Sequence, residues 1–129
     1  MSVDRLAAID THVAVWLYEG GIERFSAPAQ ETLESAQLIL PGMAFLELEF
    51  LHEIGRIDKG AQAIFRDLHR RVGLAFSPAT HGAVVEQSLT ETWTRDPFDR
   101  VIVAEARLLE LPLVTKDRNI KKRYERVVW

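Results

Sequence analysis

The chain has 129 residues, of which 47% are hydrophobic and 27% are charged, a balance that can supply a buried core and excludes a disordered chain. It contains no cysteine, which excludes a disulfide scaffold, a thiolate nucleophile and a thiolate zinc site. No apolar run approaches the roughly 20 residues that span a membrane, and the N-terminus lacks the apolar core of a secretory signal, so we expect one soluble, cytoplasmic domain over residues 1–129.

The net charge of −3 is unevenly distributed along the chain. From Lys116 to the last residue, six basic and two acidic side chains give +4, which leaves −7 for the rest. Arg66, His69, Arg70 and Arg71 form a second basic cluster. Basic patches beside an acidic centre could hold a phosphate backbone around bound cations. An ordinary solvated surface would explain each cluster equally well.

The first third of the chain alternates strand and helix. A buried strand is expected at residues 6–9, followed at once by a helical pattern that ends near Gly20. Ser26 can cap a second helix, with Pro28 in its first turn, that runs to about residue 35. Residues 37–40 then predict a second short buried strand.

The later elements continue the alternation. Glu47 is expected to open a helix that runs to about residue 54, and further helices are expected at residues 60–71, 79–93 and 98–109 and shortly before the last strand. The remaining strands are expected at residues 74–77, 113–115 and 127–129. This order favours a mainly parallel sheet covered on both faces, an α/β protein built as a three-layer α/β/α sandwich.

Two aspartates follow predicted strands. Asp10 comes after the first strand and Asp117 after the fourth, and the carboxyl ends of parallel strands are where open α/β folds bind ligands. Both acids are therefore expected in one crevice, where Thr11 and Thr115 could orient a carboxylate or a metal-bound water. A turn or helix cap is the simpler interpretation of each of these four residues taken alone.

Two further acids lie on helices. Glu47 shares its helix face with apolar residues such as Met43 and Phe50, and a charge on that face is costly without a partner. Asp96 can cap the helix that follows it, and Asp99, in the first turn of that helix, would then face the same crevice. A capping role for Asp99 itself is equally compatible with the pattern.

The chemistry that suits such a set is metal-assisted. Clustered carboxylates repel one another unless a cation neutralises them, and oxygen ligands suit Mg²⁺ or Mn²⁺ better than zinc. Such ions can hold a phosphodiester and activate water, so its hydrolysis needs no protein nucleophile. The four histidines show no paired spacing for a metal, and the sequence has neither a serine-nucleophile motif nor a phosphate-binding glycine loop.

Four segments carry a resemblance to a known family. They are Ile9-Asp10-Thr11-His12-Val13, Phe45-Leu46-Glu47-Leu48, Arg95-Asp96-Pro97-Phe98-Asp99-Arg100 and Val114-Thr115-Lys116-Asp117. Their order resembles a PIN domain, more narrowly the VapC-type toxins of type II toxin–antitoxin systems, over residues 6–129. The resemblance implies an endoribonuclease that uses Mg²⁺ or Mn²⁺ bound by Asp10, Glu47, Asp99 and Asp117. It also implies a homodimer and a cognate antitoxin that covers the acidic groove.

The chain departs from this family pattern at several positions. Pro41, Gly42 and Ala44 stand where serines are frequent, Thr94 replaces a common histidine, and Glu105 stands where a glutamine is frequent. Two other hypotheses stay open. One is a catalytically silent PIN-like binding module. The other is a phosphoacceptor signalling domain, which the lack of an acid at the end of the second strand disfavours.

Overall fold

A parallel sheet of five strands runs through the centre of the protein. The computed structural model describes residues 5–129; the first four residues of the expected domain 1–129 lie outside the described part. The strands are β1 (Leu6–Ile9), β2 (Gln37–Leu40), β3 (Ala75–Phe76), β4 (Leu113–Val114) and β5 (Val127–Val128). Their order across the sheet is β3-β2-β1-β4-β5, and every neighbouring pair is parallel. The predicted α/β class is confirmed.

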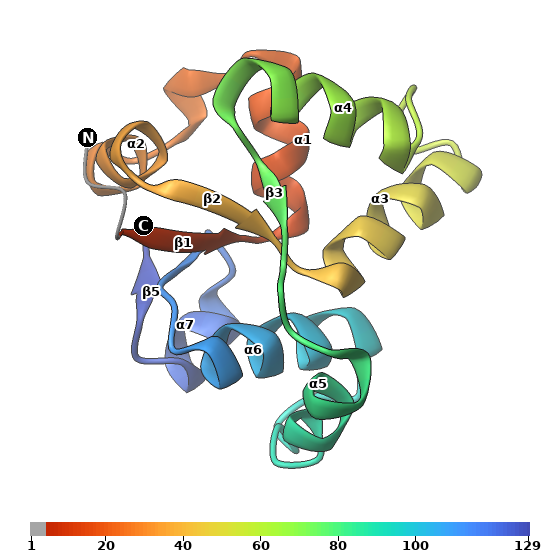
Figure 1. Ribbon diagram of the computed structural model, residues 1–129, viewed down its shortest axis with the longest axis vertical. Coiled ribbons are helices and arrows are strands. Elements are labelled where there is room, and N and C mark those ends of the chain that lie inside the picture. The colour runs from red at the N-terminus through yellow and green to blue at the C-terminus, as the bar shows by residue number, and fades with distance from the viewer. Residues whose placement is uncertain (1–4) are drawn as a thin grey trace.

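Helices cover both faces of this sheet. They are α1 (Thr11–Glu19), α2 (Ala27–Ser35), α3 (Gly42–Glu53), α4 (Ala61–Val72), α5 (His81–Ser88), α6 (Pro97–Leu109) and α7 (Arg118–Arg123), with a 3₁₀ turn at Ile22–Arg24. Figure 1 shows α1, α2 and α4 on one side of the sheet and α5, α6 and α7 on the other. This is the predicted three-layer α/β/α sandwich.

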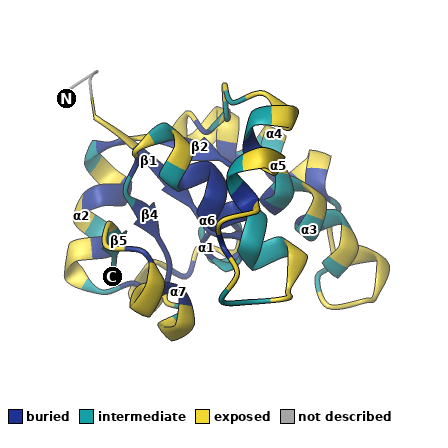
Figure 2. Cartoon of the chain, turned by 90° about the horizontal axis from the view of Figure 1, so that it is seen from below, coloured by how far each residue is buried: buried dark blue, intermediate teal, exposed yellow. Residues whose placement is uncertain are grey.

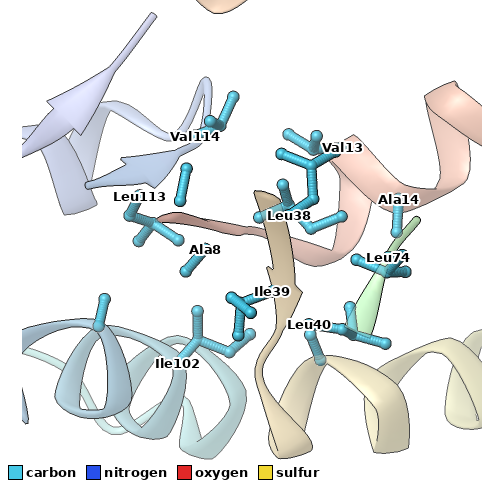
Figure 3. Close-up of a cluster of buried hydrophobic side chains, with 14 of the residues drawn as sticks. Ala8, Val13, Ala14, Leu38, Ile39, Leu40, Leu74, Ile102, Leu113 and Val114 are labelled. Carbon is cyan, nitrogen blue, oxygen red and sulfur yellow. The ribbon is translucent and has the colours of Figure 1, made fainter. Parts of the chain in front are cut away.

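The hydrophobic core lies on both faces of the sheet. Figure 3 shows Val13 of α1 near Leu38 on one face and Ile102 of α6 near Ile39 on the other. Because both faces are covered, the inner strands are apolar at successive positions instead of alternating. Figure 2 shows the buried residues concentrated in the strands and along α1 and α6. The core thus fixes the elements that carry the predicted site.

Two predicted helix boundaries are wrong. The third helix begins at Gly42, directly after Pro41, so Glu47 lies in its interior instead of at its start. The fifth helix covers only His81–Ser88, not residues 79–93, because the chain turns at residues 89 and 90. The turn brings Glu91 into the interior, where only 3% of its surface is exposed.

None of the helices within residues 5–129 combines the length and the apolar character that crossing a bilayer requires.

Candidate functional site

The pairing of β1 with β4 brings two of the predicted acids to one edge of the sheet. Ile9 is paired with Val114, so the segments that follow the two strands leave the sheet side by side. Asp10 is the N-cap of α1 and only 4% of its surface is exposed. Asp117 is the N-cap of α7, where its side chain accepts a hydrogen bond from the backbone N–H of Ile120 at 3.0 Å.

The Asp10 carboxylate is held at both oxygens. Its Oδ1 accepts the backbone N–H of Thr11 at 2.7 Å, and its Oδ2 accepts the hydroxyl of Thr115 at 2.6 Å. The Thr115 hydroxyl oxygen in turn accepts the backbone N–H of Asp117 at 3.1 Å. Hydrogen bonds to a buried carboxylate offset the cost of removing its charge from water. They also fix its orientation toward the neighbouring cleft.

Glu47 reaches the same place from α3. Its Oε1 accepts the hydroxyl of Thr11 at 2.5 Å, which connects the third helix to the first. Burial raises the pKa of the Glu47 carboxyl, and the nearby charges of Asp10 and Asp96 raise it further, while the bond from Thr11 lowers it. The charge that the sequence places on an apolar helix face therefore has a polar partner, the hydroxyl of Thr11.

Asp99 comes from the first turn of α6. Asp96 is the N-cap of that helix, as predicted, and its Oδ1 accepts the backbone N–H of Phe98 at 2.9 Å and of Asp99 at 3.3 Å. Burial raises the pKa of Asp99 to about 7, with further contributions from the charges of Asp96, Asp10, Asp117 and Glu47. The charge of every other predicted acid thus contributes to the raised pKa of Asp99, and a pKa of about 7 leaves this carboxyl partly protonated at neutral pH.

These side chains line one cleft of about 380 Å³. The cleft gathers Asp10, Thr11, Glu47, Asp99 and Asp117, and its other lining residues are His12, Val15, Trp16, Leu51, Arg56 and Ile57. Asp96 and Thr115 do not line the cleft, but Asp96 accepts the backbone N–H of Asp99 and Thr115 donates to the carboxylate of Asp10. Within residues 5–129, no three side chains of His, Asp or Glu stand in positions that would already chelate one ion. The four acids share a cleft without forming a preassembled cage.

His12 is a site residue that was not predicted from the sequence. Its Nε2 accepts the backbone N–H of Lys116 at 3.1 Å, which places the ring proton on Nδ1, and Nδ1 lies 3.6 Å from Oδ2 of Asp10. Burial lowers the pKa of His12, against the opposing charges of Asp10 and Asp117, in agreement with a neutral ring. The signal in the sequence was the position of His12 two residues after Asp10. The absence of a second histidine at metal-ligand spacing argues only against a metal site and does not bear on these contacts of His12.

Glu105 has a structural role that the sequence did not reveal. It lies in the interior of α6, 4% exposed, and its Oε1 accepts the backbone N–H of Gly42 at 3.3 Å. The N-cap residue of α3, Pro41, offers no capping side chain, so Glu105 supplies an acceptor to the start of α3 from another helix. Burial raises the pKa of Glu105, while hydrogen bonds from Ser77 and Gly42 lower it. This contact fixes α3, which carries Glu47, against α6, which carries Asp99.

The four acids fit a hard divalent cation by donor type and by charge. All the donors are carboxylate oxygens, which Mg²⁺ and Mn²⁺ prefer. Burial raises the pKa of Asp99 most, and the repulsion from the neighbouring acids, which raises it further, is the kind of repulsion that a bound cation removes. The geometry thus describes an acidic cleft at the carboxyl ends of parallel strands, suited to a cation and an anionic substrate.

Comparisons with known proteins identify the family of this chain. Residues 7–126 match the family model of the PIN domain. Ribonuclease VapC22 of Mycobacterium tuberculosis (strain ATCC 25618 / H37Rv) is 31% identical over 119 residues, which are 88% of this chain and 88% of that protein. A chain in the crystal structure of VapBC2 from Rickettsia felis bound to a DNA fragment from their promoter is 12% identical and shares the fold, with a TM-score of 0.63 over 95% of this chain and 96% of that chain. The chain belongs to the PIN domain family and is a relative of the VapC ribonucleases.

Proposed function

We propose that this protein is a metal-dependent endoribonuclease that hydrolyses RNA phosphodiester bonds in the cytoplasm, as the toxin of a VapBC-type toxin–antitoxin pair. One observation carries the proposal. Four carboxylates from the ends of β1 and β4 and from α3 and α6 line a single cleft in a PIN domain related to a VapC ribonuclease. The same cleft contains Arg56, a cation that can attract the phosphate backbone.

Asp10, Glu47, Asp99 and Asp117 are the residues that would hold Mg²⁺ or Mn²⁺. When bound, such a cation supplies Lewis-acid chemistry, because it lowers the pKa of water and neutralises charge on the phosphodiester. The protein positions the carboxylates that would hold the cation and sets their protonation. Thr115 and Thr11 hold Asp10 and Glu47 in place, and cation binding requires Asp99 to lose the proton that it partly retains at pH 7.

The proposal also includes two protein partners, a cognate antitoxin and a second copy of the chain in a homodimer. The family relationship suggests both of them. The surface of the protein offers a second reason. A groove of about 320 Å³ is lined by exposed apolar side chains, among them Leu46, Phe76 and Val85, which are 55%, 49% and 41% exposed. Contiguous exposed apolar surface of this kind is typical of protein interfaces. The acidic cleft lies outside this groove, although α3 contributes to both.

The decisive experiment is RNA cleavage by the purified chain, free of antitoxin, in Mg²⁺, in Mn²⁺ and in chelator. An Asp10→Asn variant serves as the control, with its circular dichroism and thermal unfolding compared with those of the parent. We expect cleavage that is lost in chelator and in the folded variant. If Asp10→Asn cleaves RNA as fast as the parent, the role given to Asp10 is wrong. If the parent cleaves neither structured nor unstructured RNA under any condition, the protein is a PIN-like binding module.

A further inference from the structure

A second pocket adjoins the acidic cleft on the other side of Asp99. It has a volume of about 260 Å³ and is lined by Trp93, Thr94, Asp99, Asn119, Lys122 and Arg123. Asp99 is common to both spaces, so the pocket begins where the cleft ends. We call it the α7 pocket. Its charge is opposite to that of the cleft, because two cations of α7 face a single carboxylate.

The cations of the α7 pocket are available to a ligand. Among residues 5–129, no ion pair involves the side chain of Lys122 or Arg123. Both residues are exposed at the end of α7. Asn119 adds an amide that can both donate and accept hydrogen bonds. The lining thus combines groups that bind phosphate with a group that can contact a base.

Trp93 forms a fixed wall of the α7 pocket. Its indole Nε1 donates to Oε1 of Glu91 at 3.0 Å, and Oε2 of Glu91 accepts from Nε of Arg107 at 2.9 Å. Glu91 is 3% exposed, so this chain of contacts anchors the indole from inside the protein. Trp93 itself is only half-buried, which leaves part of its ring accessible. A rigid, partly exposed aromatic ring is a surface on which a nucleobase can stack.

We propose that the α7 pocket binds the nucleotide next to the scissile phosphate of a single-stranded RNA substrate. Lys122 and Arg123 contact its phosphate, and Trp93 and Asn119 contact its base. The inference rests on the proposed ribonuclease function and adds a direction to it, because the RNA passes from the acidic cleft over Asp99 toward α7. Single-stranded RNA suits such a pocket because its bases are free to stack on aromatic side chains.

A pair of double variants with the same charge change tests the pocket. Lys122→Gln with Arg123→Gln removes both cations of the pocket, whereas Arg118→Gln with Lys121→Gln removes two exposed cations of the same helix that do not line it. Binding of a short labelled single-stranded RNA of mixed sequence is measured in chelator at several salt concentrations, and cleavage is measured separately with Mn²⁺. Circular dichroism confirms that both variants are folded.

We expect the pocket variant to bind RNA on the order of tenfold more weakly than the control variant. The slope of log affinity against log salt should fall in magnitude by about 0.7, the value for one phosphate contact on a single strand. In the cleavage assay, the rise in KM should exceed any fall in kcat.

Equal losses of RNA binding in the two double variants, with a parent that cleaves RNA, would refute the α7 pocket as an RNA site and leave the ribonuclease function intact. Selective loss of binding in a parent that does not cleave would keep the pocket as an RNA site and refute the proposed function. A parent that neither binds nor cleaves RNA would refute both.

Discussion

The hydroxyl of Thr115 donates a hydrogen bond of 2.6 Å to Oδ2 of Asp10, although the two residues are 105 positions apart in the chain. Thr115 is fully buried, and its hydroxyl oxygen also accepts the backbone N–H of Asp117 at 3.1 Å. One hydroxyl therefore connects the ends of β1 and β4, and each of these ends supplies one acid to the cleft. The position of Asp10 depends on strand pairing and on Thr115 together.

Replacement of Thr115 by Val should damage both stability and activity. Valine keeps the shape but leaves Oδ2 of Asp10 and the N–H of Asp117 without their buried partner, which costs about 1–3 kcal/mol in the free energy of unfolding. Loss of a residue that orients a metal ligand costs roughly 10–100-fold in metal affinity or activity. Urea unfolding and initial cleavage rates measure the two effects. Thr115→Ser, which retains the hydroxyl, should restore most of the activity; a Val variant as active as the parent would contradict this role.

Cleavage should depend on pH through Asp99. Its pKa is about 7, so protons compete with the cation at this carboxyl and the rate should fall as the pH falls through that value. Asp96 is the charged residue that contributes most to the raised pKa. Asp96→Asn removes this charge but keeps an N-cap residue of similar quality. The acid limb of the pH–rate profile should therefore move to lower pH in this variant. An unchanged limb would show that Asp99 does not control it.

Asp99 should also destabilise the metal-free protein. Its folded-state pKa lies above the value of 3.8 for an exposed aspartate, so between these two values the folded state binds more protons than the unfolded state. Stability then decreases as the pH rises through this window. Asp99→Asn should raise the free energy of unfolding at pH 8 by about 1–2 kcal/mol, a figure that allows for the partial exposure of the side chain. Asp58→Asn, at an exposed position, is the matched control. Chemical unfolding in chelator at several pH values is the measurement, and equal stability of the two variants at pH 8 would show that the buried Asp99 carboxylate does not destabilise the metal-free protein.

Local signals in the sequence were sufficient for much of the fold. The apolar runs at Leu6–Ile9 and Gln37–Leu40 are strands with the predicted bounds, because strands covered on both faces need continuous apolar sequence. Ser26 and Asp96 are N-caps as predicted, since capping depends on residues within one turn. The strand-end positions of Asp10 and Asp117 in the sequence predict that both acids lie at one edge of the sheet, and the pairing of β1 with β4 brings them there.

Features that depend on distant contacts could not be predicted. The buried carboxylate of Glu91, which follows the turn at the end of α5, accepts hydrogen bonds from Trp93 and Arg107, and Arg107 is 16 residues away. The interaction of His12 depends on a backbone N–H 104 residues further along the chain. Neither contact leaves a periodic pattern. The contact between Glu105 and the start of α3 belongs to the same class and yields a further prediction.

Glu105 should contribute to both stability and activity through α3. Glu105→Ala removes the acceptor for the N–H of Gly42 and leaves space in a buried position, so it should cost about 1–3 kcal/mol in the free energy of unfolding. It should also lower the cleavage rate, because α3 carries Glu47 into the cleft. Glu105→Gln keeps an acceptor oxygen and should retain activity.

Glu105 should also make stability depend on pH. Since burial raises the pKa of Glu105 above its value of 4.5 in water, the parent loses stability as the pH rises above 4.5, and the Gln variant should lose this dependence on pH. Unfolding of the parent and both variants between pH 4 and pH 8 separates the two effects: an Ala variant as stable as the Gln variant would show that the hydrogen bond to Gly42 does not stabilise the packing of α3 against α6.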